Sequence, residues 1–479
     1  MCIVFFTAND KYSLIVASNR DEFLARPTSQ ARWHAWDPHH ATDEMTDRNR
    51  VLSGLDLTAG GTWFGISVTR PPDAAPTGPA KRMHFATLTN FTESLDPALD
   101  RNAPPKPSRG NLVREYLDVL DELDFSPLPQ PHGSSPATAT AEESLDATQQ
   151  QEDRLQTYLD RIEQVKHDYA GFNLLVGEIG TFDQPAAATP RVRLGYTSNR
   201  ESGNKRARVL PSLDEPSSPS SSASAQPQSR QSQSPPDETA NRAAVHVHVR
   251  GLSNATLEVE PGEVEWPKVK SGAAAVEKVV TRLQHGSDED DDENGEAEEE
   301  TVKGLYHALS TAHPSPIQHR EHLRETVLVE PLCLDPSRPL QAVPPPLPPA
   351  PAPAPAPAFA SERAEEGSRA QQAPSPMSRG SVARASSSPL PAPSSSVSSD
   401  KNKEGVEGNR SLQWYATRVQ TLLLVERKPN GKVIFRERDA YVLDDGDSDG
   451  GDHDEGKEED EARGTPRWSG QERRYEFRL

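Results

Sequence analysis

Short stretches of the chain alternate hydrophobic and polar residues or are wholly apolar, and both patterns are typical of β-strands. Apolar runs at residues 2–8 and 12–18 lie on either side of Asn9-Asp10, which predicts a β-hairpin. A second hairpin is predicted at Pro429-Asn430-Gly431, because Asn-Gly between two strand patterns favours a tight turn. Further strands are predicted at residues 172–178, 191–197, 244–250, 421–425, 432–436 and 475–479.

Helical patterns occur between these strands. We expect helices at residues 112–123, 152–169, 273–284 and 302–311. Strands mixed with helices predict an α+β or layered-sheet domain.

Other segments lack either periodicity and are rich in Pro, Ser, Ala or acidic residues. With 33% hydrophobic residues and 45 prolines, the chain cannot fill the three cores that its length suggests. We therefore predict a single domain over residues 1–479, built from roughly 280 ordered residues. The predicted disordered inserts are residues 70–82, 128–150, 201–242, 285–300, 335–410 and 443–470.

The net charge of -21 belongs mostly to two acidic tracts. Residues 288–300 and 444–461 each carry -10, which leaves -1 for the rest of the chain. A nucleic-acid partner is therefore not expected, because phosphate binding needs a basic face. No apolar stretch approaches the ~20 residues of a membrane span, so no transmembrane segment is expected.

The chain has two cysteines, Cys2 and Cys333. They exclude a disulfide framework and are too few for a cysteine-based zinc site, so no metal is assigned. This cysteine usage suits a reducing compartment, and a cytoplasmic location is expected.

Cys2 is the most informative residue. Removal of Met1 would give one residue both a thiol and a free α-amine, and the amine can accept the thiol proton. The alternative is that Cys2 is only a buried residue of the first strand.

The polar tetrapeptide Asn19-Arg20-Asp21-Glu22 follows the second predicted strand. If the first hairpin turns at Asn9-Asp10, the tetrapeptide returns beside Cys2. Asp21 would then orient the amine, and Arg20 would stabilise a thiolate or bind an anionic group. The alternative is a turn with a surface ion pair.

Together, these residues resemble the NRDE-motif family, also called the transport and Golgi organization 2 family. Further segments resemble the family's motifs in order, and they skip the low-complexity inserts. The segments are Gly60-Gly61-Thr62-Trp63-Phe64-Gly65, Leu88-Thr89-Asn90, Ser108-Arg109-Gly110, Gly171-Phe172-Asn173-Leu174-Leu175, Ser198-Asn199, Gly251-Leu252-Ser253-Asn254, Trp266-Pro267-Lys268-Val269 and Thr417-Arg418. The chain departs from the pattern at Val419-Gln420, where the family usually has two small hydroxyl residues.

The resemblance implies an αββα four-layer sandwich like that of N-terminal-nucleophile hydrolases. By comparison with bile-salt and penicillin-V amidases, Cys2 would be the nucleophile and Asp21 its orienting carboxylate. Arg20 would be a third catalytic residue beside them. Asn90 and Asn199 would donate hydrogen bonds to an oxyanion. The alternative for each asparagine is a turn residue that bonds its own backbone. Binding roles are expected for Asn19, Glu22, Lys268 and Arg418.

Two function classes follow from the resemblance. The first is the family role in Golgi organization and protein secretion, extended to haem or to lipid and acyl-CoA homeostasis. Haem would then be a cargo, a small-molecule or hydrophobic ligand would be the partner, and the location could extend to the Golgi or mitochondria. The second is an N-terminal cysteine amidase. Neither the enzyme status nor the oligomeric state follows from the sequence.

Overall fold

The computed structural model describes most of the predicted strands and helices. The described residues are 2–46, 48–69, 82–91, 106–118, 154–180, 189–201, 205–214, 247–258, 264–285, 295–318, 320–334, 413–444 and 464–479. All of them belong to one compact unit, Met1–Val343 with Leu412–Leu479. That the whole chain is one domain stays a prediction, because residues 344–411 lie outside the described part.

The first sheet is seven-stranded and antiparallel, with the order β10-β1-β2-β12-β13-β16 and β11 paired to β12. Its strands are β1 (Ile3–Thr7), β2 (Tyr12–Phe23), β10 (Arg250–Leu252), β11 (Leu332–Leu334), β12 (Gln413–Glu426), β13 (Lys432–Asp439) and β16 (Glu472–Arg478). Strands from the two ends of the sequence are therefore neighbours, since β12 pairs with β2.

The second sheet is also seven-stranded and antiparallel, and its order follows the sequence. It contains β3 (Arg32–His34), β4 (Val51–Ser53), β5 (Phe64–Thr69), β6 (Arg82–Asn90), β7 (Phe172–Gly180), β8 (Arg191–Ser198) and β9 (Arg208–Val209). A separate two-stranded sheet pairs β14 (Tyr441–Leu443) with β15 (Pro466–Trp468).

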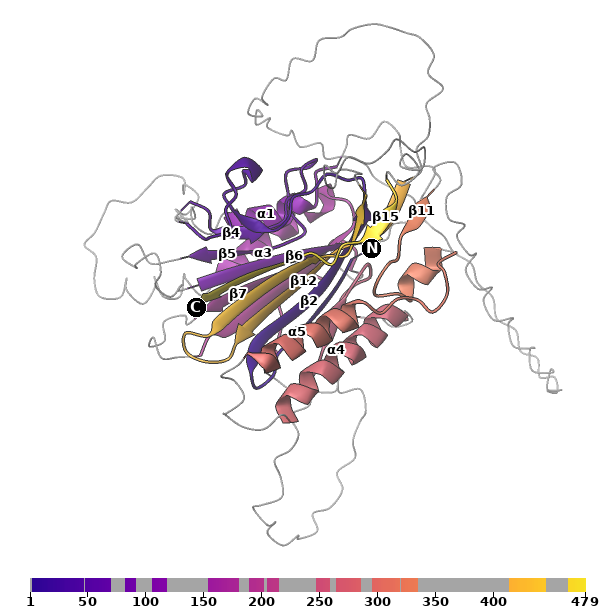
Figure 1. Cartoon of the computed structure of the whole chain (residues 1–479). Helices are drawn as coiled ribbons and strands as arrows, with labels where there is room; N and C mark the ends of the chain where they lie inside the picture. The colour runs from indigo at the N-terminus through magenta and orange to yellow at the C-terminus, as the bar shows by residue number, and fades with distance from the viewer. Residues whose placement is uncertain are drawn as a thin grey trace, which may run out of the picture. The chain divides into compact units, whose positions relative to one another are not determined.

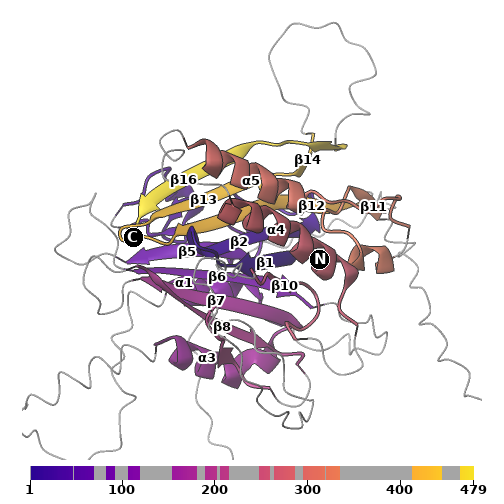
Figure 2. The same cartoon turned by 90° about the horizontal axis from the view of Figure 1, so that it is seen from below.

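Helices lie on the outer side of each sheet (Figures 1 and 2). The first sheet packs against α4 (Pro267–His285) and α5 (Glu296–Leu309), and the second packs against α1 (Gly110–Asp118) and α3 (Arg154–Val165). Short 3-10 helices are η1 (Pro38–His40), η2 (Lys166–Asp168) and η4 (Arg320–Arg324).

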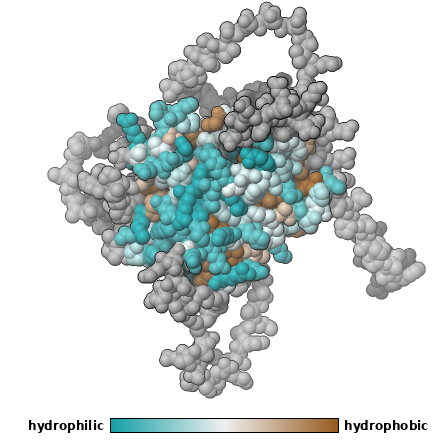
Figure 3. Space-filling view, in the orientation of Figure 1, coloured by the Kyte–Doolittle hydropathy of each residue, from teal (hydrophilic) through white to brown (hydrophobic). Residues whose placement is uncertain are grey.

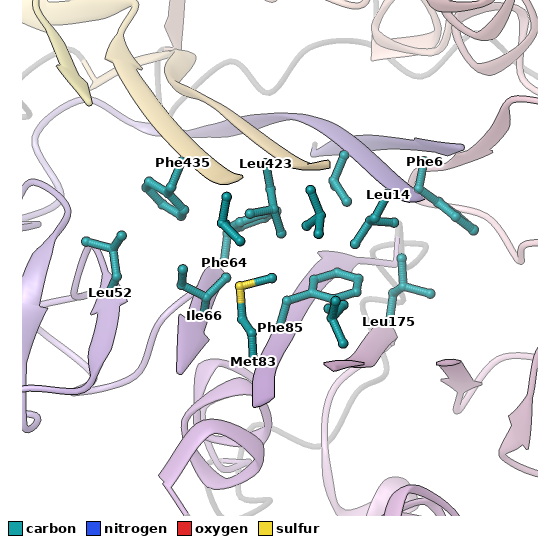
Figure 4. Packing of buried hydrophobic residues seen from close by; sticks show 14 of the residues in the cluster. Phe6, Leu14, Leu52, Phe64, Ile66, Met83, Phe85, Leu175, Leu423 and Phe435 are labelled. Carbon is teal, nitrogen blue, oxygen red and sulfur yellow. The ribbon is translucent and has the colours of Figure 1, made fainter. Parts of the chain in front are cut away.

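A central hydrophobic core fills the space between the two sheets. Leu423 and Phe435 of the first sheet point toward Phe64, Met83 and Phe85 of the second (Figure 4). Two further clusters lie between each sheet and its own helices. The described residues therefore form a mixed α+β fold with mostly antiparallel strands.

The first hairpin is confirmed, and a side chain explains its turn. Asn9 Oδ1 accepts the backbone N–H groups of Lys11 and Tyr12 at 3.1 and 2.7 Å. This is an Asx-type turn, for which asparagine is well suited. The predicted turn at Asn430 is also confirmed, with Asn430 at a φ of 51° between β12 and β13.

Some predicted boundaries were wrong. The tetrapeptide Asn19–Glu22 lies inside β2 rather than after it, because β12 continues to pair with β2 as far as Phe23. The strand predicted at residues 244–250 begins only at Arg250, and residues 244–246 lie outside the described part.

Ordered elements also occupy parts of three predicted inserts. They are β9, the first turn of α5, and β15. At α5 the acidic residues suit a helix N-terminus, and Glu298 and Glu299 pair with Arg474 of β16 at 2.7 Å. These glutamates belong to a tract that the sequence analysis assigned to solvent, and their charge is instead partly neutralised by an arginine of the first sheet. The other predicted inserts fall largely outside the described residues.

The exposed surface is mainly polar on the face in Figure 3, where hydrophobic residues are scattered. The exposed large hydrophobic residues are Phe23, Leu57, Val264 and Trp468. No helix in the described ranges is long and apolar enough to cross a membrane.

Candidate active site around Cys2

The first hairpin brings Cys2 beside the tetrapeptide, as predicted. Ile3 of β1 pairs with Asn19 of β2, so Cys2 lies next to Arg20 in the register. Cys2 is buried, and its carbonyl oxygen accepts a hydrogen bond from Ser253 Oγ at 2.8 Å.

Asn19 and Arg20 point to opposite sides of β2, as neighbouring strand residues must. Asn19 Nδ2 donates to the carbonyl oxygens of Leu309 and Val327, at 2.8 and 2.9 Å, on the helical side. The Arg20 guanidinium lies 3.8 Å from the centre of the Trp63 ring, which precedes β5 of the second sheet. Asn19 therefore ties β2 to the α5 layer, whereas Arg20 faces the second sheet.

Arg20 is a buried cation with incomplete hydrogen bonding. Its Nη2 lies 3.7 Å from Glu22, while Nη1 has no hydrogen-bond partner among the described residues. Burial lowers the pKa of Arg20, and the charges of Glu22 and Cys2 oppose this shift. The strand register places Arg20 next to Cys2.

Asp21 is held by a hydroxyl group from the neighbouring strand. Thr417 Oγ1 donates to Asp21 Oδ1 at 2.6 Å and accepts the backbone N–H of Val329 at 2.8 Å. Because the Val329 N–H can only donate, the threonine proton must point toward the carboxylate. Thr417 therefore fixes the position of the Asp21 carboxyl group.

Lys268, at the start of α4, is the second buried cation of the site. Its side chain is fully buried, and Nζ has no hydrogen-bond partner within the described residues. Burial lowers the pKa of Lys268, whereas the nearby Asp21 and Cys2 raise it. The charges of both residues therefore act on one ammonium group, which lies 5.6 Å from the centre of the Trp266 ring.

Arg418 occupies a β-bulge in β12, between the Thr417–Asp21 and Val419–Arg20 pairs. Bulges re-aim side chains and often occur near active sites. Arg418 Nη1 donates to the carbonyl oxygens of Phe23 and Arg26. Burial, with Arg20 nearby, lowers the pKa of Arg418 to about 10.

Glu22 balances these cations from the exposed end of β2. It approaches Arg20 and also Arg26, whose Nε lies 3.9 Å from its carboxylate. Arg26 in turn pairs with Asp56 at 2.7 Å. Glu22 is therefore a charge partner of the arginines, with no described contact to Cys2.

Asn90, at the end of β6, is connected to Cys2 through two bridging residues. Asn254 Nδ2 donates to the Asn90 carbonyl oxygen, and Asn254 Oδ1 lies 3.1 Å from Ser253 Oγ, whose single proton is closer to the Cys2 carbonyl. Ser253 in turn bonds the Cys2 carbonyl. The side-chain amide of Asn90 is half-buried and makes no hydrogen bond within the described part of the chain.

Asn199 differs from Asn90, because its side chain bonds the nearby backbone. Nδ2 donates to the carbonyl oxygens of Lys166, Tyr169 and Ala170, at 2.9, 3.2 and 3.2 Å. Oδ1 accepts the Phe172 N–H at 3.0 Å. These contacts hold the segment before β7, which lies 27 to 33 residues earlier in the chain. Asn199 is therefore a structural residue, but not the local turn residue considered above.

Several residues of the site were missed as functional candidates although they lie in the quoted motifs. They are Trp63, Ser253, Asn254 and Thr417. The signal was present, because the motifs contact one another: Arg109 bonds the Gly171 carbonyl, and Asn173 bonds the Ser253 carbonyl.

The Gly60-Gly61 pair serves packing in the fold. Gly60 has a φ of 71°, and a Cβ on Gly61 would lie 2.5 Å from the backbone carbon of Gly110. Two backbone segments therefore touch where both residues are glycine. The described residues contain no group of three or more His, Cys, Asp or Glu side chains that could hold a metal.

Comparison with known proteins agrees with this arrangement of motifs. A family model described as Transport and Golgi organisation 2 matches residues 1–442. The chain belongs to this family. The resemblance found in the motifs is thereby confirmed, and the match includes every strand of the two seven-stranded sheets except β16.

Named relatives align over part of their length. Transport and Golgi organization protein 2 homologs of Bos taurus and Homo sapiens are 37% and 30% identical over 135 and 191 residues. The Drosophila melanogaster Transport and Golgi organization protein 2 is 28% identical over 195 residues. These alignments span 26%, 38% and 39% of this chain and 38%, 46% and 49% of the relatives, so less than half of each relative is covered.

Proposed function

We propose that the site acts as an N-terminal cysteine hydrolase on the amide bond of a small molecule. The observation that carries this proposal is Lys268, a fully buried ammonium beside both Cys2 and Asp21 with no hydrogen-bond partner among the described residues. Burying such a cation is costly, so a fold that needed only stability would do better with an apolar side chain there. A thiolate or a developing oxyanion would offset that cost.

The reaction assigns a role to each residue. After removal of Met1, the α-amine of Cys2 takes the thiol proton, and the sulfur attacks the carbonyl carbon of the amide. The leaving amine takes the proton, and water then hydrolyses the thioester to a carboxylic acid and the free thiol. Asp21, held by Thr417, orients the α-amine.

The cations and amides would stabilise charge during this reaction. The charge of Cys2 acts on both Arg20 and Lys268, and these cations would stabilise a thiolate. The amide of Asn90, which has no hydrogen-bond partner among the described residues, is the proposed oxyanion donor. We assign Asn199 a supporting role, since its amide hydrogens already face carbonyl oxygens. Arg418 and Glu22 would adjust the charge around Arg20. Asn19 would fix the position of β2.

The arrangement of layers supports the proposal that this is an αββα sandwich of the N-terminal-nucleophile type. The two sheets share one core, and a helix pair covers the outer side of each. Cys2 lies directly before β1, which is next to the edge strand β10 of the first sheet, and a nucleophile at the start of such a strand is compatible with this fold type.

The second candidate is a role in transport and Golgi organization without catalysis. It is supported by the family match and by the names of the relatives. In this role the same site would bind a small or hydrophobic cargo, with haem or an acyl lipid as candidates. A cytoplasmic protein associated with the Golgi or mitochondria would fit this role.

The mass of the N-terminal peptide of the mature protein tests the first requirement. We expect Cys2 with a free amine, and a retained Met1 would leave no base beside the thiol. Cys2→Ala should then abolish turnover of a library of small-acyl amides. Cys333→Ala is the matched control, because Cys333 is exposed on β11.

A cell-based experiment separates the two candidates. Cys2→Ala and Cys333→Ala are expressed in cells that lack the protein and are scored for secretion and haem supply. Failure of Cys2→Ala with an intact fold supports the hydrolase. Full rescue by Cys2→Ala would support the carrier.

A further inference from the structure

The outer margin of the first sheet is formed by β16 (Figure 2). One side of β16 pairs with β13 over the whole strand, from Glu472 to Arg478. Its other side pairs with no strand in the described part of the chain. Such an edge offers a row of backbone donors and acceptors to a further strand.

The hydrogen bonds at both ends of β16 identify the groups that face outward. Leu479 N–H donates to the Gly431 carbonyl at 3.1 Å, and Asp439 N–H donates to the Gln471 carbonyl at 2.9 Å. Hydrogen-bonded pairs alternate along an antiparallel ladder, so the odd-numbered residues of β16 bond to β13. The outward N–H and C=O groups then belong to Glu472, Arg474, Glu476 and Arg478.

The charges of these four residues are self-complementary. At one residue from Tyr475 the strand has Arg474 on one side and Glu476 on the other, and at three residues it has Glu472 and Arg478. We propose that β16 pairs antiparallel with β16 of a second copy of this chain, centred on Tyr475, to form a two-fold symmetric dimer with one continuous sheet. Arg474 would then lie opposite Glu476 of the second copy, and Glu472 opposite Arg478.

The register follows from charge and from the ladder together. A two-fold axis perpendicular to the sheet pairs only residues on the same face, which excludes a shift of one residue. Centring the pair on Arg474 would place two arginines opposite each other, and centring it on Glu476 would place two glutamates together. Like charges directly opposite are destabilising, so Tyr475 is the favoured centre.

The strand is held firmly in the geometry that pairing requires. Tyr475 Oη donates to the Ala31 carbonyl at 2.6 Å, and Phe477 packs against Trp33 with ring centres 5.8 Å apart. On the opposite face, Arg474 is held by Glu298 and Glu299. The side chains that fix β16 are therefore directed away from its free edge. Charged edge strands usually resist pairing, but this charge order favours a second copy.

Sedimentation velocity of the full-length chain tests the dimer over a range of concentrations at low salt. We expect a reversible dimer at concentrations up to roughly 100 μM, because one added strand pair is a small interface. Arg474→Glu and Glu476→Arg should each weaken the dimer at least about tenfold, since each puts like charges opposite. An equimolar mixture of the two variants should restore it, because every 474–476 pair across the interface is then opposite in charge.

Two controls keep the test decisive. Arg161→Glu makes the same charge change on α3, where Arg161 is exposed beside Glu115, and it should leave the dimer intact. Glu476→Pro removes an outward N–H without touching the bonds to β13, so it should give a folded monomer. A monomeric wild-type chain would overturn the proposal. A dimer unaffected by Glu476→Pro, or a mixture that stays monomeric, would also overturn it.

Discussion

Lys268 and Asn199 are both buried polar residues at strand or helix ends, yet they differ in how many hydrogen bonds they make. The Asn199 amide has a backbone partner for each of its polar atoms. The Lys268 ammonium has none among the described residues, although Asp21 and Cys2 lie close enough to affect its pKa. Two regions of one fold therefore use buried polar groups in opposite ways.

The difference separates a structural role from a functional one. A fully bonded buried amide stabilises the fold, because removing it leaves backbone groups without partners. A buried cation without such bonds destabilises the fold, and its presence needs another explanation. By this criterion Arg20 belongs with Lys268, since its Nη1 also lacks a described partner. Asn19 belongs with Asn199.

Asn199→Ala should have the largest effect on stability. The substitution removes buried bonds to three carbonyl oxygens and one N–H group, and of these the Lys166 carbonyl keeps a bond from the Tyr169 N–H at 3.4 Å. We expect the free energy of unfolding to fall by about 3 kcal/mol, measured by urea denaturation. Asn199→Asp is the matched control: it keeps the acceptor for Phe172 and loses the donors. A change below about 1 kcal/mol in the free energy of unfolding of Asn199→Ala would contradict the structural role assigned to Asn199.

Much of the strand pattern was predictable because it is local. The two hairpins follow from Asn9 and from Asn430-Gly431, where the residues themselves determine the turn. The short strands β3, β4 and β9 were not predicted, because three or fewer residues carry too little periodicity. The longer strands β5 and β6 were also missed, although they have six and nine residues. The N-terminus of α5 was missed because its acidic residues are neutralised by arginines of β13 and β16, far away in the sequence.

The candidate site was predictable only in part, for a similar reason. Cys2 and the β2 tetrapeptide meet through a local hairpin, so the sequence could bring them together. Thr417 reaches Asp21 from a strand 396 residues away, and no spacing rule connects them. The resemblance selected Asn90 and Asn199 alike, and only their hydrogen bonds tell them apart.

Thr417→Val should have the second-largest effect on stability. It tests the functional region of the comparison at Asp21. Valine keeps the shape of the side chain but leaves Val329 N–H and the buried Asp21 carboxylate without this hydroxyl. We expect a loss of about 2 kcal/mol in the free energy of unfolding. Thr417→Ser should restore most of it. The alkylation rate of Cys2 should fall in Thr417→Val but not in Thr417→Ser. Equal rates in the two variants would show that Thr417 does not affect the reactivity of Cys2.

Lys268→Met should change stability in the opposite direction. Methionine fills a similar volume without a charge, so we expect a gain of about 1 kcal/mol at neutral pH, together with loss of amide turnover. Because burial lowers the pKa of Lys268, the unfolded chain binds the proton more tightly than the folded one. The stability of the wild-type chain should therefore rise with pH through the folded-state pKa toward 10.5, and the gain from methionine should shrink. A variant less stable than wild type at pH 7 would contradict this assignment.

Asn90→Ala should have the smallest effect on the fold and tests the comparison most closely. Only the backbone carbonyl of Asn90 is used by Asn254, and alanine keeps that carbonyl. We expect the free energy of unfolding to change by less than about 0.5 kcal/mol, in contrast to Asn199→Ala. If the unbonded amide donates to an oxyanion, the same substitution should lower kcat by roughly 100-fold or more. A large loss of stability in Asn90→Ala with unchanged kcat would contradict this assignment and give Asn90 the structural role assigned to Asn199.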